Sequence, residues 1–276
     1  MPPPCFFATL NPMSTAFLGI LSIHARPPFT YAALDDDRRV VALGQGCLAD
    51  VLAFAAGFDS ARVGIGTPAR PANGCLADPD GRARFEPQPP SRLAYLRVAD
   101  YEMIRRGVGA PVRVAAEGSP RWVQRSLALA EQLAAAGFAA HPAEDAPRQW
   151  LETPAEGVFA ALLGMPSFAC GTLESRLQRQ LALHRCRVVL PDPMDFFEEV
   201  TPHRLLNGIL PTRMIHSAAE LNALAAAYTA WLTIHNPAGV MAIGDPAEAL
   251  CWLPASDFFH NPPPSPGRRM DLPAGV

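Results

Sequence analysis

The 276-residue sequence contains no lysine, so all 23 of its Lys or Arg residues are arginines. A P-loop NTPase needs the lysine of the Gx4GK[ST] motif to reach the nucleotide phosphates, and this class is therefore excluded. The sequence is also rich in alanine and proline, so a bias in the coding sequence is the simplest explanation for the missing lysine. Arginine also suits bidentate phosphate contacts, so the bias and a phosphate-binding role are compatible.

The chain also lacks paired cysteines and a complete dinucleotide-binding motif. Its six cysteines are scattered with no CxxC pair, which is typical of reduced thiols in a cytoplasmic protein. The segments GQG and GIG both fall short of the GxGxxG fingerprint, so no dinucleotide site is expected.

Long apolar runs and an excess of positive charge are missing as well. No run of about 18 apolar residues exists, so we expect no membrane span. The start, MPPPCFFATLNP, lacks the basic segment of a signal peptide. A net charge of −3 gives no general attraction to nucleic acid, so such binding would need a local basic patch.

What is present indicates a globular α/β protein, with 49% apolar and 18% charged residues. We expect residues 1–14 to be a disordered extension, 15–254 a single domain, and 255–276 a disordered Pro-rich tail. Three apolar runs joined by short turns predict an antiparallel meander. These runs are Thr15–Ile23, Phe29–Leu34 and Val40–Leu43.

Capping residues and apolar periodicity predict the later elements. A helix over 48–56 is followed by a buried strand in ARVGIGTP, a long loop over 69–92 and a helix in YLRVADYEMIRRG. Ser119 and Pro120 predict a helix start, Thr172 predicts another, and Ser217 with Glu220 forms a capping box before the longest helix. RQWLETP, VMAIGDP and ALCWLP read as strands, so the whole predicts a mixed sheet flanked by helices.

Five stretches in order carry a family resemblance: FLGI…PFTYAALD, LRVADYEMIRR, LETPAEGVFAALLG, TLESRLQRQL…LPDPMDFFEEVTPHRLL and ELNALAAAYTAW…IGDPAEALCWLP. Over roughly residues 17–254, the sequence resembles the DUF429 family of predicted nucleases. The resemblance implies an RNase H-like fold and phosphodiester hydrolysis by two Mg²⁺ or Mn²⁺ ions, held by carboxylates that meet at one end of the sheet.

Matched position by position, this chain retains few of the acids that the resemblance implies. The first-strand aspartate of the family matches Leu21, and the aspartate of its IDAP motif matches Gly66. Asn222 stands where a helix aspartate is expected, and only Glu152 in LETP remains a carboxylate. One carboxylate is too little negative charge for two divalent cations.

Other residues offer weaker candidates. Asp245 and Glu248 follow a predicted strand. They could form a residual metal site, but we favour a polar turn at the strand end over that site by roughly three to one. Arg176 and Arg179 lie on one predicted helix face, where they could bind phosphate or pair with acids of the protein itself.

Three hypotheses follow. The chain is a divergent RNase H-like protein that has lost its metal site and keeps a binding or structural role, with nucleic acid, a phosphate-bearing small molecule or a protein as partner. Alternatively, it is an active metal-dependent nuclease with a reshaped site, or an enzyme that acts on nucleotides or small phosphates. The loss of acids favours the first.

Overall fold

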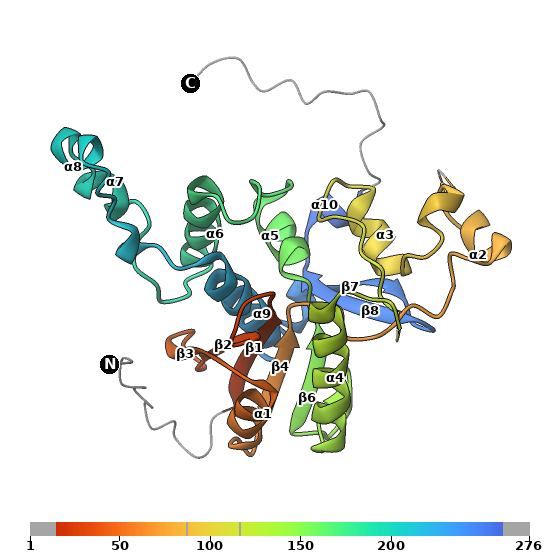
Figure 1. The fold of residues 1–276 in the computed structure, drawn as a ribbon. Coiled ribbons are helices and arrows are strands. Elements are labelled where there is room, and N and C mark those ends of the chain that lie inside the picture. The colour runs from red at the N-terminus through yellow and green to blue at the C-terminus, as the bar shows by residue number, and fades with distance from the viewer. Residues whose placement is uncertain (1–14, 87, 116, 262–276) are drawn as a thin grey trace.

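The computed structural model describes residues 15–86, 88–115 and 117–261, and a mixed eight-stranded sheet forms its centre (Figure 1). Along the sheet the order is β3-β2-β1-β4-β6-β8-β7, and β5 pairs with β6. The strands are β1 (Ala16–Ser22), β2 (Phe29–Leu34), β3 (Val40–Gly46), β4 (Ala61–Ile65), β5 (Ala139–Ala140), β6 (Arg148–Glu152), β7 (Val240–Asp245) and β8 (Ala249–Pro254).

The sheet combines two pairing modes, as the sequence predicts. Strands β1, β2 and β3 form an antiparallel meander, whereas β4 and β6 add to the other side of β1 in parallel. Parallel pairing brings the carboxyl ends of β1, β4 and β6 to one edge, where Ile20, Ile65 and Glu152 lie in register. This α/β sheet confirms the predicted fold class and is compatible with an RNase H-like architecture.

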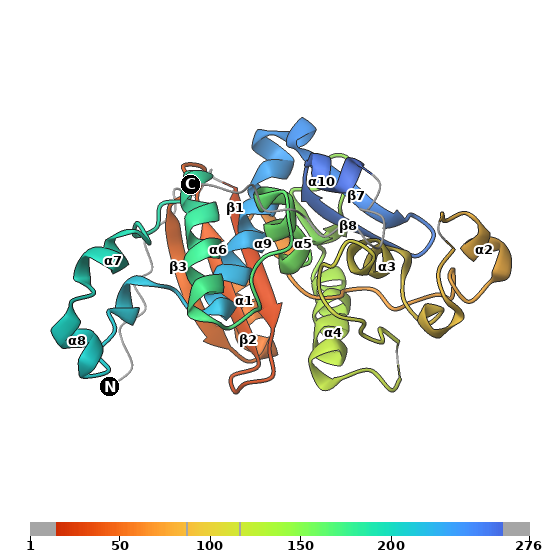
Figure 2. The ribbon, with the colours of Figure 1, turned by 90° about the horizontal axis from the view of Figure 1, so that it is seen from above.

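Helices cover both faces of the sheet, as Figures 1 and 2 show. The helices are α1 (Leu48–Ala56), α2 (Pro79–Ala83), α3 (Val98–Ile104), α4 (Arg121–Ala135), α5 (Ala155–Leu163), α6 (Leu173–Arg185), α7 (Asp195–Glu199), α8 (Pro202–Leu206), α9 (Ala218–His235) and α10 (Asp257–His260). Short 3-10 segments are η1 (Ser91–Leu93), η2 (Thr212–Met214) and η3 (Pro237–Gly239). Within the described residues, no helix has the length and apolar character needed to cross a membrane.

Side-chain alternation along β1 divides the core into two layers. Phe17 packs into the cluster formed by α5, α6 and α9, whereas Leu18 and Ile20 pack into the cluster formed by α1 and α4. Because successive strand residues point to opposite faces, one fully buried strand serves both clusters.

Helix α9 lies unusually close to the sheet. A Cβ atom on Gly19 of β1 would come within 1.8 Å of the carbonyl oxygen of Ala223, and one on Gly64 of β4 within 2.4 Å of that of Ala226. Only glycine on the strands and small residues on the helix allow this approach. This close packing fixes the position of Asn222, in the first turns of α9, relative to the carboxyl ends of the strands.

The helices α7 and α8 stand away from the rest of the molecule. We call residues 191–215, with α7, α8 and η2, the arm; Figures 1 and 2 both show it projecting beyond β3. It leaves the body after α6 and returns at the start of α9. Both ends of the arm are anchored by Gln180, whose side chain donates to the carbonyl oxygens of Pro191 and Met214.

Several boundaries differ from the sequence predictions. Residues 255–261 are ordered and contain α10, because the buried Arg106 donates hydrogen bonds to the carbonyl oxygens of Phe258, Phe259 and Asn261. The predicted extension over 1–14 and the rest of the predicted tail, 262–276, lie outside the described residues.

The predicted loop over 69–92 and one predicted cap also need correction. The loop contains α2, since Asp78 accepts a hydrogen bond from Gly81 N and Pro79 opens the helix. Helix α4 starts one residue later than predicted, with Pro120 as its N-cap. The hydroxyl of Ser119 is occupied by the backbone N–H and C=O groups of Ala115 instead.

The predicted capping box at α9 is confirmed and has a pH signature. Ser217 Oγ accepts from Glu220 N, and Glu220 Oε2 accepts from Ser217 N at 2.7 Å. The His216 side chain, 3.7 Å away, and the Ser217 bonds together lower the pKa of Glu220 from 4.5 to about 2, against the opposing effect of burial.

We expect Glu220→Gln to destabilise the protein near neutral pH, by an amount that shrinks as the pH falls from 4.5 toward about 2. A carboxyl with a depressed folded-state pKa stabilises the fold only while it is ionised, so its contribution is complete above the unfolded-state pKa. Urea unfolding of both proteins across this range measures the difference. Thr172→Ala is the control, because it removes the cap of α6, in which Thr172 accepts from Ser175 N and no carboxylate takes part, and its loss of about 1 kcal/mol should not depend on pH. A Glu220→Gln difference that stays constant to pH 2 would contradict this assignment.

Candidate functional site

Three of the four positions implied by the resemblance line one cavity of about 240 Å³ at the carboxyl ends of the parallel strands. Leu21 follows Ile20 near the end of β1, Gly66 directly follows β4, and Asn222 reaches the cavity from α9. Glu152 ends β6 in register with Ile65, one residue before Gly66. The fold therefore brings all four positions to one end of the sheet, where open α/β sheets bind their ligands.

Leu21 and Gly66 form an apolar corner of this cavity. The Leu21 side chain is 6% exposed, and its Cδ1 lies 3.1 Å from the place where a Cβ on Gly66 would be. Hydrocarbon therefore fills the space above Gly66. Neither residue offers an oxygen ligand from its side chain to a cation.

Glu152 is buried in an ion pair that the sequence analysis missed. Arg97, the residue before α3, donates to Glu152 Oε1 at 2.6 Å and to Oε2 at 2.9 Å. It also donates to both carboxylate oxygens of Asp100 at 2.8 Å, and its remaining N–H bonds the carbonyl oxygen of Arg70 at 3.0 Å. All five N–H groups of the Arg97 guanidinium thus have acceptors.

The ion pairs of Arg97 with Glu152 and Asp100 are buried, so solvent screens them little. Arg97 is 1% exposed and Glu152 2%. Burial by itself lowers the pKa of Arg97, but the negative charges of Glu152 and Asp100 outweigh it and hold that pKa well above its ordinary value. The cation between the two carboxylates is a guanidinium that stays charged at every relevant pH.

The remaining lone pairs of Glu152 are used by other protein donors. Ala69 N donates to Oε2 at 2.7 Å, and the Cys251 thiol of β8 lies 3.2 Å from Oε1. Burial and the adjacent Glu152 charge raise the pKa of Cys251 well above its ordinary value, so the thiol keeps its proton. We call the four positions implied by the resemblance the carried-over positions. Glu152 is the one carboxylate among them, and both of its oxygens are therefore occupied.

A second buried arginine holds Asn222 on the other side of the cavity. Arg179 of α6 is fully buried and donates to Asn222 Oδ1 at 2.7 Å. It also donates to Glu156 Oε2 at 2.6 Å and Ser167 Oγ at 2.9 Å. Of the arginines predicted to bind phosphate, Arg179 thus has acceptors from the protein, and Arg176 donates to the carbonyl oxygens of Ile215 and His216. Phosphate binding would require these bonds to be exchanged.

Asp245 and Glu248 lie at the turn between β7 and β8, outside the cavity lining. Glu248 accepts from Val98 N at 2.7 Å, at the start of α3, and from Asn73 N at 3.0 Å. Asp245 accepts from Ala247 N and lies 3.7 Å from Arg84. These contacts match the polar-turn interpretation. No cluster of three or more His, Cys, Asp or Glu residues suited to a metal ion occurs in the described part of the chain.

The rest of the cavity wall is mostly apolar, with polar side chains at its edge. Met103, Ile104, Val108, Val112 and Trp122 contribute carbon surface. The polar lining residues are Asp100, Glu156, Asn222 and Thr67. Sequence reasoning missed Arg97, Asp100 and Glu156, although the i, i+3 spacing of Arg97 and Asp100 at a helix start could have suggested their pairing.

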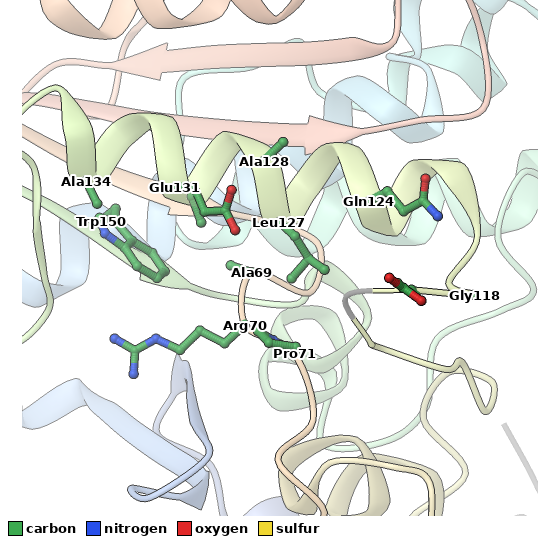
Figure 3. A pocket seen from close by; sticks show the side chains of 12 residues that line it. Ala69, Arg70, Pro71, Gly118, Gln124, Leu127, Ala128, Glu131, Ala134 and Trp150 are labelled. Atoms are coloured by element: carbon green, nitrogen blue, oxygen red, sulfur yellow. The ribbon is translucent and has the colours of Figure 1, made fainter.

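A second cavity, of about 650 Å³, lies between α4 and the Ala69–Pro71 segment (Figure 3). Helix α4 forms one side with Leu127 and Glu131. Trp150 of β6 lies at one end, where the Arg70 guanidinium stacks 5.3 Å from its ring centroid. None of the carried-over positions lines this cavity.

Comparison of the chain with models of protein families, with curated proteins and with solved structures found no match. The resemblance to the DUF429 family therefore stays a prediction, and the chemistry of the site rests on its geometry.

We expect Arg97→Met to destabilise the protein by about 3–5 kcal/mol, because it leaves two carboxylates buried without their cation. Combining it with Glu152→Gln should recover part of this loss, since the double variant removes one of the stranded charges. Urea unfolding gives each free energy.

Arg84→Gln is the matched control. Its partner Asp245 lies 3.7 Å away and the Arg84 side chain is 71% exposed, so the expected loss is under about 1 kcal/mol. Equal losses for Arg97→Met and Arg84→Gln would show that the buried pair is not a major support of the fold.

Proposed function

We propose that this chain is a divergent RNase H-like protein whose strand-end cavity is a binding site and no longer a two-metal nuclease centre. The observation that carries the proposal is the position of Arg97, whose guanidinium binds both Glu152 and Asp100. These are the acids that a divalent cation at this end of the sheet would need.

Charge and coordination support this proposal. Hard divalent cations take oxygen ligands, usually with two or more carboxylates for each pair of ions. Leu21 and Gly66 supply no side-chain oxygen, and the oxygen of Asn222 accepts from Arg179. A cation between Glu152 and Asp100 would have to lose its hydration shell and displace a buried guanidinium whose five N–H groups all have acceptors.

The charge around the cavity indicates what it binds. Asp100, Glu152 and Glu156 carry three negative charges, against the two positive charges of Arg97 and Arg179. The remaining negative charge opposes phosphate, and the chain as a whole also has a net charge of −3. We therefore propose a small, largely apolar ligand without a phosphate group.

A cytoplasmic location is part of the same proposal. The five cysteines within the described residues, namely Cys47, Cys75, Cys170, Cys186 and Cys251, are all free thiols, which suits a reducing compartment.

An active nuclease with a reshaped metal site is the second candidate, and the meeting of the four carried-over positions at the strand ends favours it. The two candidates differ in what Glu152 does. In a nuclease it binds metal, and Glu152→Gln abolishes turnover; in a binding protein it neutralises Arg97, and the same variant only loses stability.

We expect no Mg²⁺- or Mn²⁺-dependent cleavage of DNA or RNA, and no Mn²⁺ binding by calorimetry at millimolar concentrations. For comparison with the wild type, we combine Leu21→Asp, Gly66→Asp and Asn222→Asp. This triple variant places three carboxylates around the cavity. Removing Leu21 also clears the space above residue 66. This variant should bind Mn²⁺ at least about tenfold more tightly than the wild type. Cleavage that Glu152→Gln abolishes would overturn the proposal.

For the cavity itself, we expect 1-naphthol to quench Trp122 fluorescence and 1-naphthyl phosphate to bind at least about tenfold more weakly, because only the second carries negative charge. Val112→Trp should fill the cavity and remove the effect. Ala134→Trp, in the second cavity, is the control and should preserve it. Tighter binding of the phosphate would instead support an enzyme that acts on small phosphates.

A further inference from the structure

The arm, residues 191–215, exposes more large apolar side chains than any other segment of similar length in the described part of the chain. Leu206 is 87% exposed and Leu205 58%. The exposed apolar side chains of the arm are Met194, Phe197, Leu205, Leu206, Ile209 and Leu210.

Polar contacts, and not a core of its own, hold the arm together. Glu199 at the end of α7 accepts from Arg204 of α8 at 2.6 Å and from Arg213 of η2 at 3.3 Å. Phe196 is the buried aromatic side chain of α7, whereas the neighbouring Phe197 is 55% exposed. The shape of the arm is thus defined while its apolar side chains remain uncovered.

Two helices of five residues each are too short to be stable in water by themselves. Helices of this length normally depend on an apolar face packed against another surface. In the arm, the body of the protein does not provide that surface for α8, none of whose residues is buried.

We propose that the arm is a dimerisation surface, and that its apolar side chains pack against the arm of a second copy of this chain. Together these side chains expose roughly 600 Å², at the upper end of the largest apolar patches found on monomers. Two arms related by a two-fold axis can bury at most twice that area, about 1,200 Å², which is the lower limit for specific, stable interfaces.

The arm exposes charges of both signs, and its four acids against two arginines give it a formal net charge of −2. Asp195 and Glu198 are exposed acids of α7, whereas the exposed His203 and the 77% exposed Arg213 side chain lie on α8 and η2. In a two-fold dimer, if α7 of the first copy contacts α8 of the second, then α8 of the first copy contacts α7 of the second in the same way. Crossed packing, with α7 of one copy against α8 and η2 of the other, brings acids toward bases at both ends of the interface.

The arm is also free to reach a second copy. It projects from the edge of the molecule beyond β3, whereas the strand-end cavity is lined by residues of the body (Figure 1, Figure 2). Dimerisation through the arm thus leaves the cavity open, and the inference does not depend on the proposed function.

Sedimentation equilibrium of the full-length chain tests the proposal. We expect the wild type to have twice the mass of the chain at about 50 µM, which corresponds to a dissociation constant in the low micromolar range or below. Leu206→Glu combined with Ile209→Glu places charge at the centre of the surface and should weaken dimerisation roughly thirtyfold or more. Both side chains are more than half exposed, so the thermal unfolding of this variant should match that of the wild type when both are monomeric.

Phe168→Glu is the matched control. Phe168 is 57% exposed, as much as Leu205, but lies between α5 and α6 and should leave the dimer intact. A monomeric wild type would overturn the proposal and indicate that another segment or another protein covers the arm. A dimer that persists in the Leu206→Glu, Ile209→Glu variant would also overturn it, by assigning the contact to a different surface.

Discussion

The five hydrogen bonds of the Arg97 guanidinium connect parts of the chain that are far apart in sequence. Through Glu152 and Asp100 they join the end of β6 to the start of α3, and through the carbonyl oxygen of Arg70 they fix the segment after β4. Cys251 adds β8 to the same cluster. Because Arg97 and Glu152 are buried, removing the guanidinium leaves Glu152 and Asp100 without their cation, and the geometry of the strand ends depends on it.

This arrangement also decides the chemistry of the strand ends. Acids brought together at this edge repel each other unless a cation lies between them. Here an arginine of the chain supplies that cation, so the carboxylates need no metal ion to be stable. Arg179 does the same for Glu156 and fixes the amide of Asn222. Between the two clusters lies a largely apolar space, and the Arg97 cluster keeps one net negative charge because it holds two carboxylates.

Much of the fold follows from local signals in the sequence. Alternating and continuous apolar runs predicted the meander and the parallel strands, and capping residues such as Thr172 and Ser217 predicted helix starts that the structure confirms. Errors occurred where a tertiary contact overrides a local signal. Ser119 bonds Ala115 instead of capping α4, and the bonds of Arg106 to the chain after Ser256 order residues that composition alone predicts to be disordered.

The sequence by itself determined the strands that end near Leu21, Gly66 and Glu152, because apolar runs and turn residues are local signals. The parallel register that brings these residues to one edge was decided by the tertiary structure. The sequence also determined that positions 21, 66 and 222 carry no carboxylate, since they are Leu21, Gly66 and Asn222. Only the tertiary structure decided the partners of Glu152, since Arg97 lies 55 positions earlier in the chain and its side-chain direction depends on the packing of α3. The exposure of Leu206 was equally hidden from the sequence, because an apolar helix looks the same whether its face meets a core or solvent.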